Sequence, residues 1–121
     1  ELLKRSGADG VMIGRGAQGR PWFLEQVSHY LKTGEKLAAP SLAVQLETIL
    51  RHYDAMIAHH GRQGVRIARK HLAWYCNSLR NATEFRRVVN VLDDPDKVKD
   101  QIRAFYEPLV ENEIKLDRQA A

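Results

Sequence analysis

The sequence has a single cysteine, Cys76, and lacks any apolar run long enough to cross a membrane. One cysteine excludes an internal disulfide bond and suits the reducing conditions of the cytosol, so we expect a cytoplasmic protein with no membrane partner. A length of 121 residues is typical of one domain with a hydrophobic core of its own. These absences argue against a disulfide-stabilised secreted domain and against an integral membrane protein.

Acidic residues are nearly absent from one quarter of the chain. Between residues 61 and 90 the only carboxylate is Glu84, and seven basic residues minus this one acid give a formal charge of +6. After residue 90 the balance reverses, with eight acidic residues against five basic ones. A concentrated positive segment beside an acidic one predicts an anionic partner that docks on one face. The seven bases are Arg62, Arg66, Arg69, Lys70, Arg80, Arg86 and Arg87.

A glycine-rich turn follows a short apolar run near the start of the chain. The run Val11–Ile13 leads directly into Gly14, Arg15 and Gly16. In parallel α/β sheets a short buried strand followed by such a turn forms a ligand-binding edge. The glycines let backbone N–H groups approach an anion, and the arginine adds a positively charged guanidinium that can donate two hydrogen bonds. The pattern favours a phosphate-binding turn, with a plain strand-to-helix turn as the alternative. Because one parallel strand cannot form a sheet, we expect the first forty residues to be part of something larger.

The rest of the chain is predicted to be helical. Pro21 suits the first position of a helix that closes at Gly34, and residues 33–40 are typical of a polar linker. Four amphipathic helices follow with short turns, which predicts a small antiparallel bundle. The first is expected from Ser41 to about Gly61, and the second from about Gln63 to Leu79. The third would begin with a capping box of Asn81 and Glu84 and run through Val91, and the fourth would start at Asp94-Pro95.

The second of these helices has two contrasting faces. An aromatic-rich side is expected to pack inward, and for its histidine, His71, a packed position is favoured over a phosphate contact. Four bases project from another side at spacings of three and four residues, and they repel one another unless a negative group lies between them. This side suits nucleic-acid phosphates or, equally, a solvated helix face. The inward set is Ile67, His71, Trp74, Tyr75 and Leu79; the basic set is Arg62, Arg66, Arg69 and Lys70.

Two segments together resemble the carboxy-terminal third of bacterial tRNA-dihydrouridine synthases, and most closely their B-type branch. The first is residues 7–22, GADGVMIGRGAQGRPW, and the second is residues 66–75, RIARKHLAWY. Turns like the first occur in many flavin-binding barrels, whereas the second motif at this distance behind the first is far more specific. The likeness extends from near residue 1 to about residue 110.

The resemblance implies a mainly α chain in three parts. Residues 1–39 would be the last strand and helix of an FMN-binding (β/α)8, or TIM, barrel, with Val11–Ile13 as the strand. Residues 40–111 would be a four-helix tRNA-binding domain, and residues 112–121 a polar tail. Gly14 and Arg15 would bind the FMN phosphate, which agrees with the common position of phosphate sites in such barrels.

The family reaction reduces the C5–C6 bond of a uridine in tRNA. By resemblance, NADPH reduces FMN, hydride passes from the flavin to the base, and a cysteine on a barrel loop donates the proton. The target uridine must leave its base stack, which requires tight binding of the surrounding RNA. Arg66, Arg69 and Lys70 are the expected tRNA phosphate contacts.

Cys76 is not expected to act as the family's catalytic cysteine. It lies within a predicted bundle helix, where a free cysteine is usually a small core residue. We therefore expect no turnover by this polypeptide alone, and we expect a longer parent protein to supply the missing barrel portion. Two alternatives remain: the tail of another FMN-dependent TIM-barrel oxidoreductase, and a stand-alone helical RNA-binding module.

Overall fold

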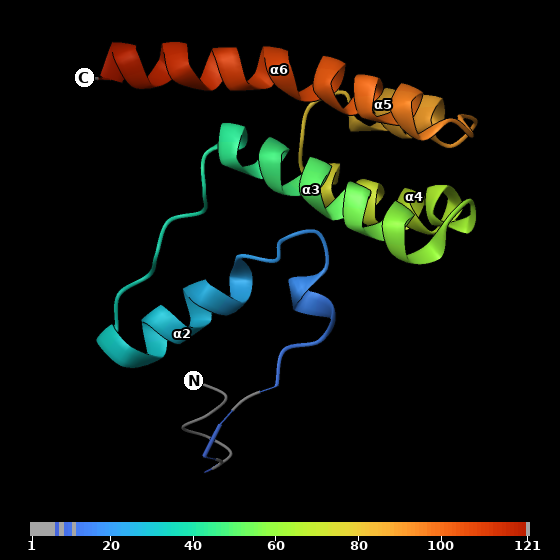
Figure 1. Ribbon diagram of the computed structural model, residues 1–121. Helices are drawn as coiled ribbons and strands as arrows, with labels where there is room; N and C mark the ends of the chain where they lie inside the picture. The colour runs from blue at the N-terminus through green and yellow to red at the C-terminus, as the bar shows by residue number, and fades with distance from the viewer. Residues whose placement is uncertain (1–6, 8, 11, 121) are drawn as a thin grey trace.

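The computed structural model describes residue 7, residues 9–10 and residues 12–120, and over this part of the chain the protein is helical with no strand. The prediction of a mainly α chain is confirmed for these residues. A single turn of 3-10 helix precedes five α-helices, and the first of these α-helices lies apart from those that follow it (Figure 1). The elements are η1 (Arg15–Ala17), α2 (Phe23–Thr33), α3 (Leu42–His60), α4 (Gln63–Cys76), α5 (Ala82–Val89) and α6 (Pro95–Ala120).

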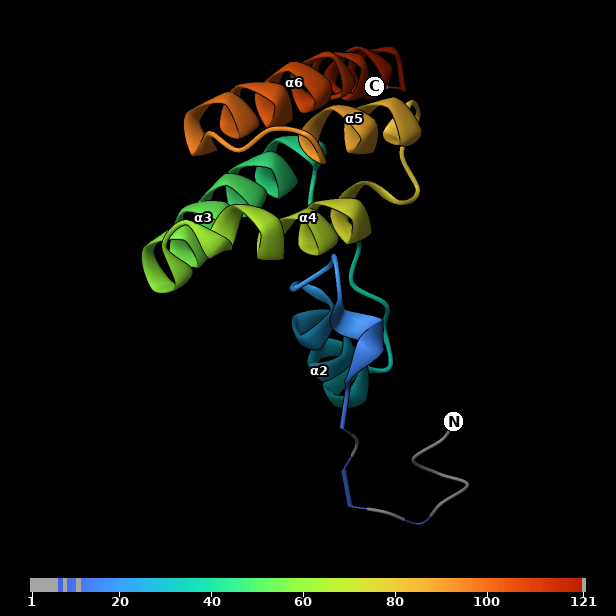
Figure 2. The same cartoon turned by 90° about the vertical axis from the view of Figure 1, so that its right-hand side faces the viewer.

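The four carboxy-terminal helices share one hydrophobic core. α5 and α6 lie over α3 and α4, as both views show (Figures 1 and 2). Tyr53 from α3, Leu72 from α4 and Tyr106 from α6 are fully buried between these layers. The rings of Phe85 and Phe105 stack with their centroids 4.5 Å apart and join α5 to α6. Burial of large apolar side chains from all four helices supplies the main driving force for folding here.

Several helix ends lie where local chemistry predicts them. Ser41 caps α3, and its hydroxyl accepts a hydrogen bond from the Val44 amide at 3.3 Å. Gly34 ends α2 in the left-handed conformation, with φ 74°, which a glycine adopts without steric cost. Asp94 precedes α6, and its carboxylate accepts a hydrogen bond from the Asp96 amide at 3.0 Å. These ends depend on neighbours in sequence, so sequence patterns identify them.

The predicted capping box of Asn81 and Glu84 is wrong. Asn81 precedes α5 with a left-handed backbone, φ 62° and ψ 19°, and its side chain accepts no capping hydrogen bond. A capping side chain reaches the first helical turn from an extended backbone, and Asn81 lacks that geometry. The Glu84 carboxylate instead accepts a hydrogen bond from Arg87 at 3.0 Å. The preceding helix α4 also ends three residues earlier than predicted, at Cys76.

The buried face of α4 is rotated from the predicted one. Ile67, His71 and Trp74, which were expected to pack inward, are only half-buried, and of that set Tyr75 alone reaches the core. The aromatic side of α4 meets the segment before α2, where Trp22 lies with its ring centroid 6.3 Å from that of Tyr75. The four small or aliphatic residues that face the core instead are Val65, Ala68, Leu72 and Cys76.

Gly64 allows α3 and α4 to approach closely. A Cβ at this position would lie 2.8 Å from the Met56 carbonyl oxygen and 3.1 Å from the Cα of Ile57. Both of these neighbours are backbone atoms, so neither can move aside as a flexible side chain would.

We expect Gly64→Ala to lower the free energy of unfolding by about 1–2 kcal/mol, because the added methyl group forces the two helices apart. Urea denaturation followed by circular dichroism measures the change. The control is Gly10→Ala, since a Cβ at Gly10 meets nothing within 4 Å. Equal stability of the Gly64 and Gly10 variants would contradict the proposed close contact.

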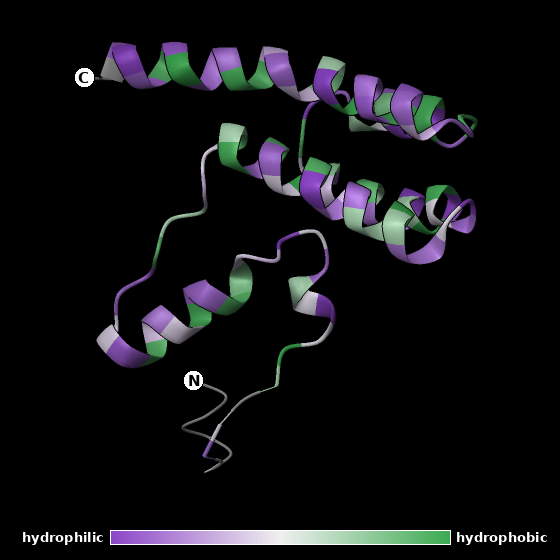
Figure 3. Ribbon diagram, in the orientation of Figure 1, coloured by the Kyte–Doolittle hydropathy of each residue, from purple (hydrophilic) through white to green (hydrophobic). Residues whose placement is uncertain are grey.

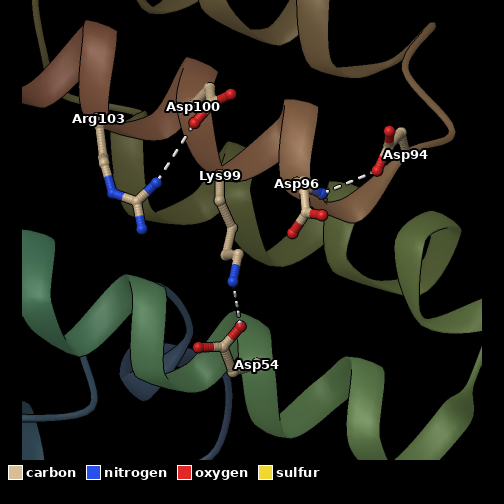
Figure 4. Close-up of polar contacts among 6 residues, drawn as sticks. All are labelled: Asp54, Asp94, Asp96, Lys99, Asp100 and Arg103. Carbon is tan, nitrogen blue, oxygen red and sulfur yellow. Dashed lines mark hydrogen bonds and ion pairs between the residues drawn. The ribbon is translucent and has the colours of Figure 1, made fainter.

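Polar contacts fix α6 relative to α3. Lys99 of α6 donates to the Asp54 carboxylate of α3 at 3.1 Å, while Arg103 pairs with Asp100 of its own helix (Figure 4). Near the start of α3, the Leu42 amide donates to the Glu113 carboxylate at 2.9 Å. Of these contacts, the bonds of Lys99 to Asp54 and of Leu42 to Glu113 join α6 to α3, and the partly exposed ion pairs contribute little to stability. α6 continues through residues 112–120, so this stretch is helical.

The segment before the linker has much less buried surface. Met12 and Ile13 have no regular secondary structure, and Val11 lies outside the described residues, so the predicted strand Val11–Ile13 stays a prediction. Polar and apolar residues alternate along α2 (Figure 3), yet none of its residues is fully buried, and Leu24 and Leu31 are 55% and 52% exposed. Among the described helices, none is both long and apolar enough to cross a membrane.

Candidate functional site

Three basic side chains form an exposed ridge along α4 and the residue that precedes it. Arg62, Arg66 and Lys70 follow one another at intervals of four residues, and all three are exposed. Within the described part of the chain, none of them belongs to an ion pair. Four residues of helix rise about 6 Å, so the three charges are spaced at about this interval along the helix axis. We call Arg62, Arg66 and Lys70 the basic ridge.

Arg69 is directed elsewhere. Its side chain is 25% exposed, and its guanidinium donates to the Leu92 carbonyl at 3.1 Å and to the Asp93 carboxylate at 3.3 Å. Its Nε is buried, with no hydrogen-bond partner among the described atoms. The fold therefore separates Arg69 from Arg66 and Lys70, and uses it to hold the loop between α5 and α6 against α4.

A cleft of about 540 Å³ opens beside the amino-terminal end of the ridge. Arg62, Arg66 and Asp93 line it, and Ile57, Val65 and Pro95 supply its apolar surface. Asp93 pairs with Arg69 at 3.3 Å, so the carboxylate of this cleft already has a cationic partner, whereas Arg62 and Arg66 have none among the described residues. No sequence pattern indicates the contact of Asp93 with Arg69, because 24 residues separate them.

Two histidines and a tyrosine form a cluster on the other side of α4. The Nδ1 of His52 lies 2.9 Å from the Tyr75 hydroxyl, and the His52 and His71 rings are 5.1 Å apart. His71 also meets Trp74 edge to face, with ring centroids 5.1 Å apart, so it is a packed histidine as the sequence favours. Burial raises the pKa of Tyr75 to about 12. The phenol therefore stays protonated at neutral pH and can donate to the unprotonated His52 nitrogen.

Both histidines lose basicity in the folded chain. Burial lowers the pKa of His52 below its ordinary 6.5. Burial, His52 and the neighbouring Lys70 together lower the pKa of His71. The unfolded chain therefore binds protons at these two positions more readily than the folded chain does. The stability that this difference provides is present above pH 6.5 and is lost as the pH falls through the folded pKa values.

We expect the free energy of unfolding to decrease between about pH 7 and about pH 5, because protons bind the unfolded histidines first. Urea denaturation across this range measures it. The double substitution His52→Asn and His71→Asn should make the dependence on pH shallower. The control replaces the exposed His59 and His60 with asparagine and should keep the dependence on pH as steep as in the wild type. An equally steep dependence in the His52 and His71 double variant would contradict the role of these two histidines.

The glycine-rich turn runs directly into η1, which begins at Arg15 and has Gly14 as the residue before it. The Gly14 carbonyl accepts a hydrogen bond from the Ala17 amide at 3.1 Å, and Arg15 opens the single helical turn. A Cβ at Gly14 would meet nothing within 4 Å, so the backbone here is open on that side. Arg15 is exposed and belongs to no ion pair with another described residue.

Cys76 is a core residue, as the sequence predicts. It is fully buried at the end of α4, and its thiol lies 3.6 Å from the Ala73 carbonyl oxygen, to which it donates. Burial raises the pKa of this thiol, which keeps it protonated. A protonated thiol without access to solvent is a poor nucleophile and cannot deliver a proton to an external substrate.

Comparison with known proteins gives consistent matches. The model of the family described as dihydrouridine synthase (Dus) matches residues 1–111. A probable tRNA-dihydrouridine synthase of Rickettsia conorii is 50% identical over 117 residues, which cover 95% of this chain and 35% of that protein. The tRNA-dihydrouridine synthase B of Xanthomonas axonopodis is 48% identical over 111 residues, covering 91% of this chain and 33% of that protein. The chain thus spans about a third of the length of the curated relatives it matches.

Proposed function

The chain belongs to the dihydrouridine synthase family, and from this we propose that it is the carboxy-terminal part of an FMN-dependent tRNA-dihydrouridine synthase. In this proposal α3–α6 form the tRNA-binding domain, and residues 1–39 complete a barrel supplied by the rest of a longer protein. The observation that carries the proposal is the basic ridge of Arg62, Arg66 and Lys70, which remains exposed after the rest of α4 has packed.

The ridge matches the geometry of a nucleic-acid strand. Its charges recur about every 6 Å along the helix, an interval similar to the separation of successive phosphates in a single strand. Arginine and lysine bind phosphates by charge-assisted hydrogen bonds and by displacing counterions. Arg66 and Lys70 would contact phosphates directly. Arg69, which was also expected to make such a contact, would act by holding the loop of Leu92 and Asp93 in place beside the ridge.

The turn at Gly14 and Arg15 suits the phosphate end of FMN. Its chemistry fits an anion, because an exposed guanidinium stands beside a backbone that no side chain covers. When bound, FMN reduced by NADPH supplies the hydride that reduces the C5–C6 bond of uridine in tRNA. In this chain, the turn at Gly14 and Arg15 would hold the phosphate of the cofactor, and the basic ridge would bind the RNA. Because Cys76 is sequestered in the core, this chain would catalyse no turnover alone.

The exposed apolar side of α2 supports a missing barrel. Leu24, Tyr30 and Leu31 remain between 45% and 55% exposed. A helix with an uncovered apolar side is usually packed against another element in the intact protein. In a barrel such a helix covers the neighbouring strands, which fits the proposed place of α2 as the last barrel helix.

A hybrid enzyme tests the proposal. In it, this chain replaces the matching third of the Pseudomonas putida tRNA-dihydrouridine synthase B, which is 44% identical over 106 residues. We expect the hybrid to bind FMN and to form dihydrouridine in an unmodified tRNA, as measured by mass spectrometry, and Arg15→Ala to weaken FMN retention. A folded hybrid that retains FMN as tightly with Arg15→Ala, or that forms no dihydrouridine, would contradict the proposal.

A further inference from the structure

A second cleft lies between the segment before α2 and the end of α4. Its volume is about 420 Å³, which is within the range of sites that hold small ligands. The segment reaches α4 at Gly19, where a Cβ would lie 2.5 Å from the carbonyl carbon and oxygen of Trp74, and where φ is +76°. Figure 2 shows this segment extending up to the end of α4. Only glycine satisfies both conditions, so Gly19 fixes the approach that forms the cleft.

The lining of this cleft combines flat aromatic surfaces with amide and hydroxyl groups. Trp22, Trp74 and Tyr75 provide the aromatic surfaces, and both of the chain's tryptophans are among them. Gln18, Asn77 and Ser78 supply polar side chains that make no hydrogen bond to other described residues, whereas no carboxylate lines the cleft within the described chain. Aromatic surfaces with hydrogen-bonding groups suit a planar heterocycle that has polar edges.

The basic ridge leads to this cleft. Arg62, Arg66, Lys70 and Trp74 lie at successive intervals of four residues, so Trp74 is the next position of the same helical row. Arg20, on the opposite wall, is exposed, and its guanidinium lies over the Phe23 ring rather than beside a carboxylate. A strand whose phosphates follow the ridge would therefore arrive at the cleft with a base next to Trp74.

We propose that this cleft holds an unpaired nucleobase of the RNA strand whose phosphates bind the basic ridge. The inference rests on the proposed function, because the ridge must first bind RNA. The base packs against Trp74 and Trp22, and the side chains of Gln18 and Asn77 bond to its polar edge. Along the chain, the lining of the cleft begins at Gln18, three residues after Arg15 of the proposed FMN phosphate turn.

The test uses the full chain and two labelled oligomers of about ten nucleotides, one of ordinary single-stranded RNA and one with the same phosphates but no bases. Label anisotropy measures binding and tryptophan fluorescence reports the cleft. We expect both oligomers to bind the ridge. Only the RNA should quench the tryptophans, and it should bind at least about fivefold more tightly, since base stacking on an aromatic side chain is worth about 1–3 kcal/mol.

Substitution assigns this difference to the cleft. The double variant Gln18→Ala and Asn77→Ala should reduce the preference for RNA and leave the affinity for the base-free oligomer unchanged. The control Asn112→Ala, at an exposed position of α6, should change neither. Equal affinity and equal quenching with both oligomers, or an unchanged preference in the double variant, would overturn the nucleobase site while the RNA-binding proposal stands. Failure of both oligomers and of tRNA to bind would overturn the proposed function, and the nucleobase site with it.

Discussion

Replacing Arg62, Arg66 and Lys70 together with glutamate should weaken binding of tRNA by at least about 100-fold at moderate salt. Each reversal removes a phosphate contact and adds a like charge beside the strand, and proteins that bind several phosphates owe most of their nonspecific affinity to such contacts. All three side chains are exposed and have no ion-pair partner within the described chain, so the reversals leave the core intact. Filter binding or label anisotropy measures the affinity.

A control with the same change in net charge separates the ridge from general charge. The triple substitution Lys97→Glu, Lys115→Glu and Arg118→Glu alters three exposed residues of α6 and lowers the net charge by the same amount. We expect the affinity of this control for tRNA to fall by less than about tenfold, because long-range attraction alone is strongly screened at moderate salt. Equal losses in the two triple variants would mean that net charge, rather than the ridge, determines binding.

Arg69→Ala should lower the free energy of unfolding by about 1.5–3 kcal/mol. The variant leaves the Leu92 carbonyl without its donor, removes the partner of Asp93 and takes away a half-buried side chain. The ion pair itself contributes little, because Asp93 is 84% exposed, so most of the loss comes from the hydrogen bond to Leu92 and from packing. Urea denaturation followed by circular dichroism measures this change.

Lys70→Ala is the matched comparison, since it removes a neighbouring charge from an exposed position. We expect it to change the free energy of unfolding by less than about 0.5 kcal/mol, as is usual for surface substitutions. Binding should show the opposite order: Lys70→Ala weakens the affinity for tRNA directly, whereas Arg69→Ala keeps most of it when the chain is folded. A neutral effect of Arg69→Ala on stability with a large loss of affinity would contradict the structural role of Arg69.

The sequence predicts well those features that depend on neighbouring residues. Ser41, Gly34 and the pair Asp94-Pro95 mark helix ends because a side chain or a backbone preference acts within one turn. The spacing of Arg62, Arg66 and Lys70 likewise places them together on any helix, whatever packs against it. The family is also identified from the sequence, because the motifs at residues 7–22 and 66–75 both lie within the match to the family model over residues 1–111.

Features that depend on contacts between residues far apart in the chain are not predicted by local sequence patterns. The basic spacing includes Arg69 as well as Lys70, but only the fold brings Leu92 and Asp93 to Arg69 and withdraws it from the ridge. The aromatic side of α4 looked like the core because Trp74 and His71 are large, whereas helix packing selected smaller residues such as Ala68. These choices reflect how four helices meet, and a pattern along one helix does not contain that information.

The cleft of Trp22 and Trp74 has the same origin. Nothing in the sequence indicates that Gly19 touches the backbone of Trp74, 55 positions further along the chain. Once that contact is known, the requirement for glycine follows from its positive φ and from the absence of room for a Cβ. The candidate base-binding site therefore comes from the structure, whereas the sequence indicates the basic side of this helix but includes Arg69 in it.

The most direct test of the proposed RNA-binding ridge is the salt dependence of tRNA binding by the wild-type chain and by two single variants. The logarithm of the binding constant should fall steeply and linearly with the logarithm of salt concentration in the wild type. Arg66→Ala should reduce the magnitude of that slope by roughly one, since one phosphate contact is lost, and Arg69→Ala should leave the slope unchanged. A slope near zero in the wild type, or a slope that Arg69→Ala reduces and Arg66→Ala does not, would contradict the ridge as the site of phosphate binding.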